Sequence, residues 1–96
     1  MKNYEIMFIV RPTLSEEDVT KVVDNFKNIL TTNGAKIDDM QEMGQRELAY
    51  EIKKFKSGYY YVVTVSENDD AAIKEFDRLA RISNDVIRHL ITKIEK

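Results

Sequence analysis

The chain has 96 residues, of which 43% are hydrophobic and 33% charged, a composition typical of a globular protein with one core. The chain has no cysteine, which excludes a disulfide framework, a thiolate nucleophile and cysteine-ligated zinc, and its single histidine excludes a cluster of histidine ligands. The net charge of −2 at pH 7 gives no overall reason to expect a polyanionic partner. We therefore expect one domain over residues 1–96, without a metal or cofactor.

The start of the chain predicts neither export nor membrane insertion. No apolar run approaches the roughly 20 residues that span a bilayer. The opening Met1-Lys2-Asn3-Tyr4-Glu5 has an acidic residue where a signal peptide would begin its apolar segment. We expect a cytoplasmic protein.

The first half of the chain predicts a strand and then a helix. Both alternating sets of positions over residues 4–10 are mostly apolar, as in a strand inside a sheet, and Pro12 ends the strand. Ser15 and Asp18 resemble a capping box. A helix over residues 15–33 follows, ended by Asn33-Gly34, with an apolar stripe at helical spacing: Val19, Val22, Val23, Phe26, Ile29 and Leu30.

Residues 35–65 predict two strands around a basic turn. The polar residues of 35–43 indicate an edge strand or a protruding ribbon, and Gly44 indicates a bulge or a close approach of another backbone segment. Residues 44–52 alternate like a strand with one face in water. Lysines at positions 53, 54 and 56 lie at or beside the connecting turn, and Gly58 can adopt backbone angles that a side chain would forbid. Tyr59–Val65 is aromatic and β-branched, as in a central strand.

The last third predicts a second helix and a fourth strand. The helix starts at Asn68-Asp69-Asp70 and is broken by Ser83-Asn84-Asp85, and residues 86–94 form the strand. The order is strand, helix, strand, strand, helix, strand, so right-handed crossovers place both helices on one face of a four-stranded antiparallel sheet. This is the α+β, ferredoxin-like βαββαβ fold with strand order 4-1-3-2.

Charge is distributed unevenly along the chain. Residues 14–31 carry four acidic and two basic side chains, and residues 74–96 carry six basic and four acidic ones. With the lysines of the turn, this distribution is compatible with one acidic helix and one basic side or edge. Solvated surface charge is the alternative interpretation.

The tyrosines of the third strand leave two interpretations open. Gly58-Tyr59-Tyr60-Tyr61-Val62-Val63 partly matches the motif with which an RNA-recognition sheet stacks on bases. Ser57 stands where that motif has a basic residue, and Tyr60 where it has a small one. Tyr59 or Tyr61 could stack on a base, or the tyrosines could be core or interface residues.

Five segments together resemble the bacterial small-subunit ribosomal protein six family, and the resemblance runs from end to end. They are Asn3-Tyr4-Glu5, Asn33-Gly34-Ala35, Gly44-Gln45-Arg46-Glu47-Leu48-Ala49-Tyr50-Glu51-Ile52-Lys53, Ser57-Gly58-Tyr59-Tyr60 and Leu79-Ala80-Arg81-Ile82-Ser83-Asn84-Asp85-Val86-Ile87-Arg88. The ten-residue segment around Leu48-Ala49-Tyr50 is the most specific.

The resemblance implies a non-catalytic protein of the 30S subunit, without a small-molecule substrate. It implies binding to the central domain of 16S ribosomal RNA together with ribosomal protein eighteen, as a heterodimer. Arginine would grip two phosphate oxygens and lysine would act as a mobile charge. By analogy, the candidates for RNA or partner contact are Lys2, Tyr4, Arg46, Lys53, Lys54, Lys56, Arg78, Arg81 and Arg88.

Each candidate has a structural alternative. Arg46 could pair with Glu42 or Glu47, and Arg78 and Arg81 could be solvated charges on the second helix. Tyr50 is expected to pack with Leu48 and Ile52. His89 is expected to be a satisfied strand residue near the RNA or partner surface, because no titratable group stands beside it in sequence.

This chain also departs from the family pattern. Many members have a basic residue where Gln45 or Glu47 stands, and proline where Glu51 stands. The segment is therefore less basic, and we expect weak binding to RNA alone, with a basic partner supplying charge.

Two other classes share the predicted fold. A regulatory module that binds a small molecule as a homodimer needs a pocket of convergent polar groups, and the sequence shows no cluster of residues that predicts such a pocket. An acylphosphatase-like enzyme needs a phosphate-cradling loop after the first strand, and Arg11-Pro12-Thr13-Leu14 has an arginine but no glycine-rich nest.

Overall fold

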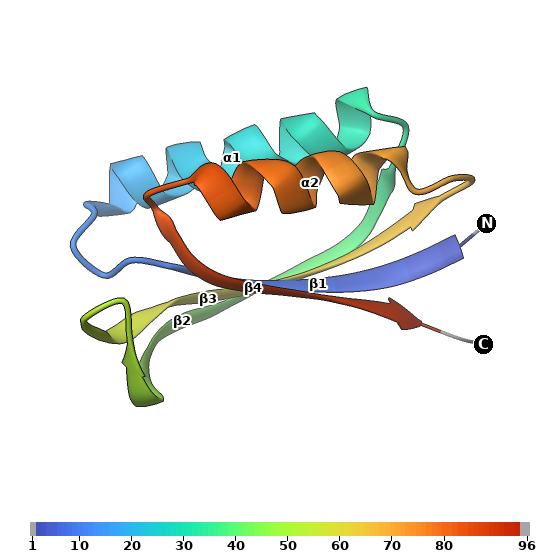
Figure 1. The fold of residues 1–96 in the computed structure, drawn as a ribbon. Helices are drawn as coiled ribbons and strands as arrows, with labels where there is room; N and C mark the ends of the chain where they lie inside the picture. The colour runs from blue at the N-terminus through green and yellow to red at the C-terminus, as the bar shows by residue number, and fades with distance from the viewer. Residues whose placement is uncertain (1, 95–96) are drawn as a thin grey trace.

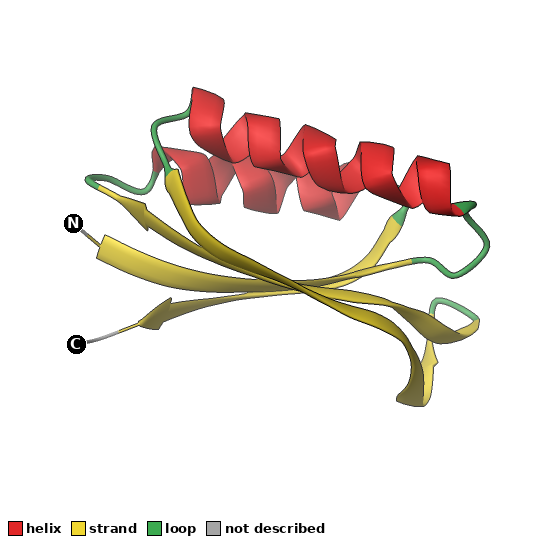
Figure 2. Cartoon of the chain, turned by 180° about the vertical axis from the view of Figure 1, so that it is seen from behind, coloured by secondary structure: helices red, strands yellow, loops and turns green. Residues whose placement is uncertain are grey.

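The computed structural model describes residues 2–94. Its elements are β1 (Lys2–Val10), α1 (Glu16–Thr32), β2 (Lys36–Ile52), β3 (Phe55–Glu67), α2 (Ala71–Ile82) and β4 (Val86–Ile94). The strands form one antiparallel sheet in the order β2-β3-β1-β4, and both helices cover the same face of it (Figure 1 and Figure 2). The predicted ferredoxin-like fold is confirmed. Glu95 and Lys96, two members of the C-terminal charge balance, lie outside the described residues.

The core lies between the central strands and the helices. Ile6, Phe8 and Val10 of β1 are buried on the helix side. The ring of Phe8 lies 5.6 Å from that of Phe26 on α1 and 5.8 Å from that of Phe76 on α2, measured between centroids. Aromatic pairs at such distances contribute beyond the area they bury. These contacts hold both helices against β1.

Side chains near the start of both helices accept hydrogen bonds from backbone amides. Ser15 accepts a 3.3 Å hydrogen bond from the amide of Asp18, as the predicted cap requires. At α2, Asp69 accepts from the amide of Ala71 at 3.0 Å. Buried Glu67, at the end of β3, accepts from Ala72 at 3.3 Å. This role of Glu67 was not predicted from the sequence, because it depends on how β3 meets the helix.

Two predictions about glycines in the hairpin had different outcomes. Gly44 has φ +77°, and the register with β3 shifts between Glu42 and Gly44, so the predicted bulge is confirmed. Gly58, however, does not make the turn, because β3 already begins at Phe55. A Cβ at Gly58 would lie 2.4 Å from Cγ2 of Ile9. Gly58 therefore permits close approach of β1 to β3 and does not use the left-handed backbone angles open to glycine.

Candidate nucleic-acid interface

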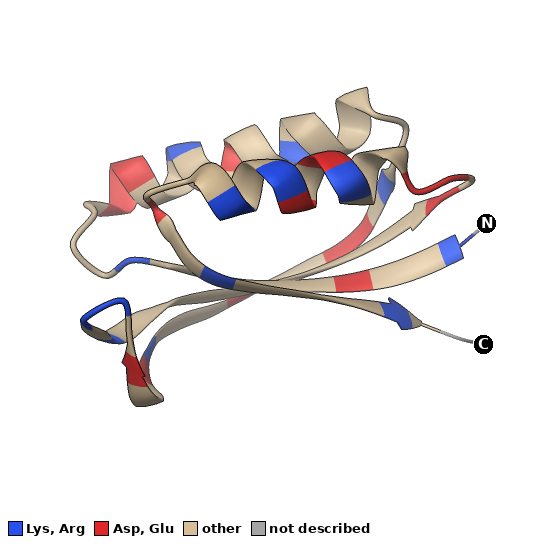
Figure 3. Cartoon of the chain, viewed as in Figure 1, with Lys and Arg blue, Asp and Glu red and all other residues tan. Residues whose placement is uncertain are grey.

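The turn between β2 and β3 consists of two lysines in left-handed conformation. Ile52 pairs with Phe55, so only Lys53 (φ 50°) and Lys54 (φ 71°) lie between the paired ends. Two-residue turns with positive φ at both positions favour Asn-Gly, since most other side chains are strained there. Both lysines and Lys56 are exposed, and Figure 3 shows the basic turn at the end of the hairpin. The fold thus holds three ammonium groups at a protruding tip despite a strained backbone.

The hairpin curls below the sheet and reaches the opposite edge. β2 and β4 are the two edge strands, yet Arg88 on β4 donates a 3.4 Å hydrogen bond from Nη1 to the hydroxyl of Tyr50 on β2. Figure 1 shows the end of the hairpin bending away from the helices. Tyr50 is 66% exposed, so the expectation that it packs in the sheet is wrong. The curl instead associates Arg88 with the hairpin.

Arg46 also belongs to the hairpin. Its Nε donates a 3.2 Å hydrogen bond to the carbonyl oxygen of Met43. Within residues 2–94 it forms no ion pair, so the alternative of pairing with Glu42 or Glu47 is not observed. Its exposed guanidinium can therefore bind an external anion without first leaving a carboxylate.

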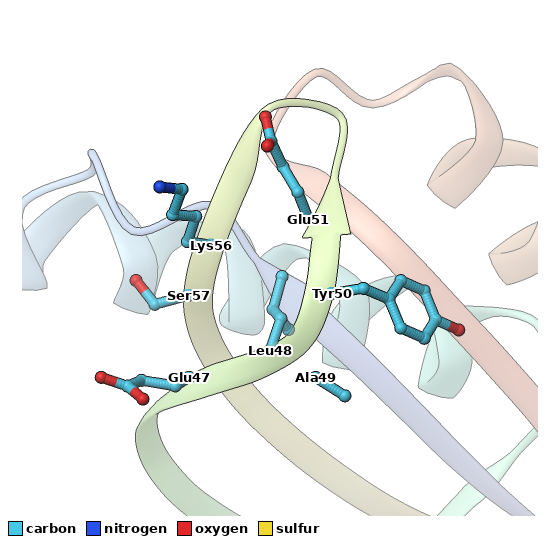
Figure 4. Close-up of a pocket in the computed structure, with 7 residues that line it drawn as sticks. All are labelled: Glu47, Leu48, Ala49, Tyr50, Glu51, Lys56 and Ser57. Carbon is cyan, nitrogen blue, oxygen red and sulfur yellow. The ribbon is translucent and has the colours of Figure 1, made fainter.

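The curl creates a hollow of about 580 Å³ along the end of the hairpin (Figure 4). Tyr50 points toward β4, while Lys56 and Ser57 extend from the β3 side. Two carboxylates and one ammonium group give it mixed charge, which suits contacts to a polar macromolecule. Its lining residues are Glu47, Leu48, Ala49, Tyr50, Glu51, Lys56 and Ser57.

The cations of α2 are already paired within their own helix. Arg78 pairs with Glu75, and Arg81 lies 3.1 Å from Asp77. Arg78 holds the pKa of Glu75 below its usual value. Exposed pairs of this kind contribute little to stability, so exchanging a carboxylate for a phosphate costs little. All four residues belong to α2 (Ala71–Ile82), and Figure 3 shows α2 in the helical layer, on the other side of the sheet from the curled end of the hairpin.

The two candidates at the start of β1 lie at the other end of the sheet. Lys2 is exposed, and its charge helps to lower the pKa of Asp70, although Lys74 is the main cause. Tyr4 is half-buried and packs against the core. Figure 1 places the N-terminus opposite the hairpin turn. The structure thus distributes the nine candidates over the hairpin with Arg88, the outer face of α2, and the start of β1.

The tyrosines of β3 do not form a base-stacking platform. Tyr61 is 8% exposed, and its ring stacks on Phe8 with centroids 5.3 Å apart. Tyr59 packs against the same core, because alternate residues of a strand share a face. Both tyrosines face the helical side, and buried Tyr61 is a core residue, which was one of the two interpretations left open by the sequence. Only Tyr60 belongs to the alternate, uncovered face.

The sequence did not predict the contact between the titratable side chains of His89 and Asp77. Nε2 of His89 on β4 lies 2.7 Å from Oδ1 of Asp77 on α2, although no such partner stands near His89 in sequence. His89 and then Arg81 lower the pKa of Asp77. The histidine also packs edge-on against Phe76. Its contacts fasten α2 to β4, which confirms a satisfied strand histidine.

The loop after β1 does not offer a free phosphate cradle. Nε of Arg11 donates to Oδ1 of Asp85 at 3.0 Å, and Nη1 donates to Thr13 at 2.8 Å. The acylphosphatase-like alternative would need this guanidinium for substrate. Within residues 2–94, moreover, no group of His, Cys, Asp and Glu side chains could hold a metal, and no helix is long and apolar enough to cross a membrane.

Comparison with known proteins agrees with this geometry. The family model of Ribosomal protein S6 matches residues 3–93. The crystal structure of 30S ribosomal protein S6 from Thermotoga maritima is 33% identical, with a TM-score of 0.90 over 97% of this chain and 87% of that chain. The C-terminal domain of the MgtC protein from Mycobacterium tuberculosis shares the fold alone. It is 11% identical, with a TM-score of 0.66 over 99% of this chain and 89% of that domain.

The family match spans nearly the whole chain and includes the hairpin, α2 and β4. The chain therefore belongs to the ribosomal protein S6 family, and it is a structural, ribosomal RNA-binding protein of the small ribosomal subunit in the cytoplasm.

Proposed function

We propose that this chain binds the central domain of 16S ribosomal RNA jointly with ribosomal protein eighteen, as a heterodimer. The basic turn of the hairpin carries the proposal: Lys53, Lys54 and Lys56 are all exposed, and Figure 3 shows the basic turn at the end of the hairpin. Lysines in such a place neutralise RNA phosphates and release their counterions. Arg46 and Arg88 extend the same surface toward the sheet.

The charge of the chain argues for joint rather than independent binding. Its net charge is −2, and the cations of α2 are each paired with a neighbouring carboxylate. Only part of the basic side is therefore available to RNA. A basic partner protein supplies the missing charge and completes the surface.

The proposal is tested by titrating the purified chain into a central-domain RNA fragment, with and without ribosomal protein eighteen, at two salt concentrations. We expect joint, salt-sensitive binding that is much weaker for either protein alone. The variant K53N/K54G keeps the turn and removes two charges, so the slope of log affinity against log salt should fall by about 1.5. K21A/K27A, which removes two charges from α1, is the matched control and should leave the slope unchanged.

Two outcomes would contradict the proposal. One is failure of the two proteins to bind RNA together while the chain runs as a stable homodimer, which favours a regulatory module. The other is turnover of an acyl phosphate substrate, since we propose that the chain acts by binding and not by catalysis.

A further inference from the structure

A second hollow lies on the helical side of the sheet, between the start of α1 and the strands β2 and β3. Its volume is about 330 Å³. This is near the lower limit for small-molecule pockets and suits one long side chain. We call it the acidic slot, and its lining includes Glu16 of α1, Glu42 and Gly44 of β2, and Tyr59 and Tyr61 of β3.

The charge of the acidic slot is entirely negative. Glu16 and Glu42 line it, and no lysine or arginine does. Within residues 2–94, neither carboxylate forms an ion pair. Figure 3 shows the acidic start of α1 that borders the slot. Two uncompensated carboxylates at one hollow favour a cationic occupant.

The Tyr61 side chain adds a polar group to the acidic slot. Tyr61 is 8% exposed and its ring stacks on Phe8, while its hydroxyl oxygen is open to the slot and is not among the fully buried unpartnered atoms of residues 2–94. Burial first, then Glu42 and Tyr59, raises the pKa of Tyr61, so the hydroxyl stays neutral and can accept a hydrogen bond. It lines the slot and is available to a donor there.

We propose that the acidic slot receives an arginine side chain of a basic partner protein. A guanidinium group has five donors in a planar fork, enough for both carboxylates and the Tyr61 hydroxyl. Tyr59 also lines the slot, and an aromatic ring attracts a cation that lies over its face. The proposal deepens the heterodimer function proposed above and rests on it for the identity of the partner. It places protein contact on the helical side and leaves the hairpin turn to RNA.

The first test uses small probes and needs no partner protein. N-acetyl-arginine amide, titrated at millimolar concentration, should shift the amide NMR signals of Gly44, Tyr59 and Tyr61. N-acetyl-citrulline amide has nearly the same shape without the charge and should not. The variants E42Q and Y61F should weaken the arginine response. Equal shifts with both probes, or shifts elsewhere only, would overturn the proposal.

The second test measures binding of ribosomal protein eighteen by calorimetry. E42Q should bind about tenfold more weakly than the wild type, as expected for loss of one charged hydrogen bond. E17Q makes the same change on exposed α1 surface outside the slot and should bind like the wild type. Equal affinity of E42Q and wild type overturns the slot and leaves the heterodimer standing. If wild type fails to bind the protein but responds to the arginine probe, the heterodimer fails and the slot stands.

Discussion

Replacing Gly58 with alanine tests the register of the two central strands. The added methyl group would lie 2.4 Å from Cγ2 of Ile9, 3.0 Å from the carbonyl oxygen of Val10 and 3.5 Å from Cδ1 of Ile87. Cγ2 is bonded directly to the Cβ of Ile9, and the carbonyl belongs to the backbone. Neither atom is the end of a flexible side chain that could swing away, so the strands must separate or the side chains must leave their preferred rotamers.

Whether G58A stabilises or destabilises the protein depends on which of two free-energy terms is larger. In an open strand, Gly→Ala stabilises by roughly 0.5–1 kcal/mol. Overpacking a filled core costs about 1–3 kcal/mol, and Ile9 and Val10 are 2% and 0% exposed. We expect G58A to lose about 2 kcal/mol of unfolding free energy. For a domain of this size, that lowers Tm by about 8–16 °C.

The assay is urea and thermal unfolding followed by circular dichroism. S57A, at the neighbouring strand position, is the control and should stay within about 0.5 kcal/mol of wild type. I9A removes the clashing methyl group. The loss of unfolding free energy in G58A/I9A should therefore be smaller, by about 1 kcal/mol or more, than the sum of the losses in the two single variants. A G58A protein as stable as wild type would refute the close approach of β1 to Gly58.

Three further changes test other parts of the structure. K53N/K54G should raise the unfolding free energy by about 1–2 kcal/mol, because Asn-Gly adopts the left-handed turn without the strain of two lysines; a loss in urea unfolding would contradict the turn geometry. Burial raises the pKa of Glu67, so its contribution to stability is present below the unfolded-state pKa and is lost as pH rises through the folded-state pKa. E67Q should therefore be more stable than wild type at pH 7 and converge with it near pH 4, and parallel pH curves would count against this reasoning. His89 and Arg81 lower the pKa of Asp77, so its contribution is present above the unfolded-state pKa and is lost as pH falls through the folded-state pKa. Relative to wild type, D77N should lose up to about 1 kcal/mol of unfolding free energy at pH 6 and none at a pH below the folded-state pKa of Asp77. An equal loss at both pH values would show that the charge of Asp77 is not responsible.

Local patterns predicted the elements well because each pattern acts over a few residues. Ser15 and Asp18 are three positions apart, so the start of α1 is a property of one turn of backbone. The bulge at Gly44 is equally local. The sequence also predicted the central position of β3, since a run of apolar and aromatic residues is stable only where both faces are covered or partly covered.

Contacts between segments distant in sequence could not be predicted from such local patterns. The partner of His89 is twelve residues away, and that of Tyr50 is thirty-eight residues away on the opposite edge strand. Each contact depends on the register of the sheet, the position of a helix over it or the curl of the hairpin. For the same reason, the candidate cations could be named from the sequence, but their division into three separate surfaces could not.

The sequence by itself determined the order of elements, the fold class and the family, because spacing, caps and the segment around Leu48-Ala49-Tyr50 are all readable along the chain. Only the tertiary structure decided which way the β3 tyrosines face and why Gly58 must lack a side chain. A period of two shows that a strand has two faces. Which face the helices cover, and how closely the next strand approaches, depends on packing between segments distant in sequence.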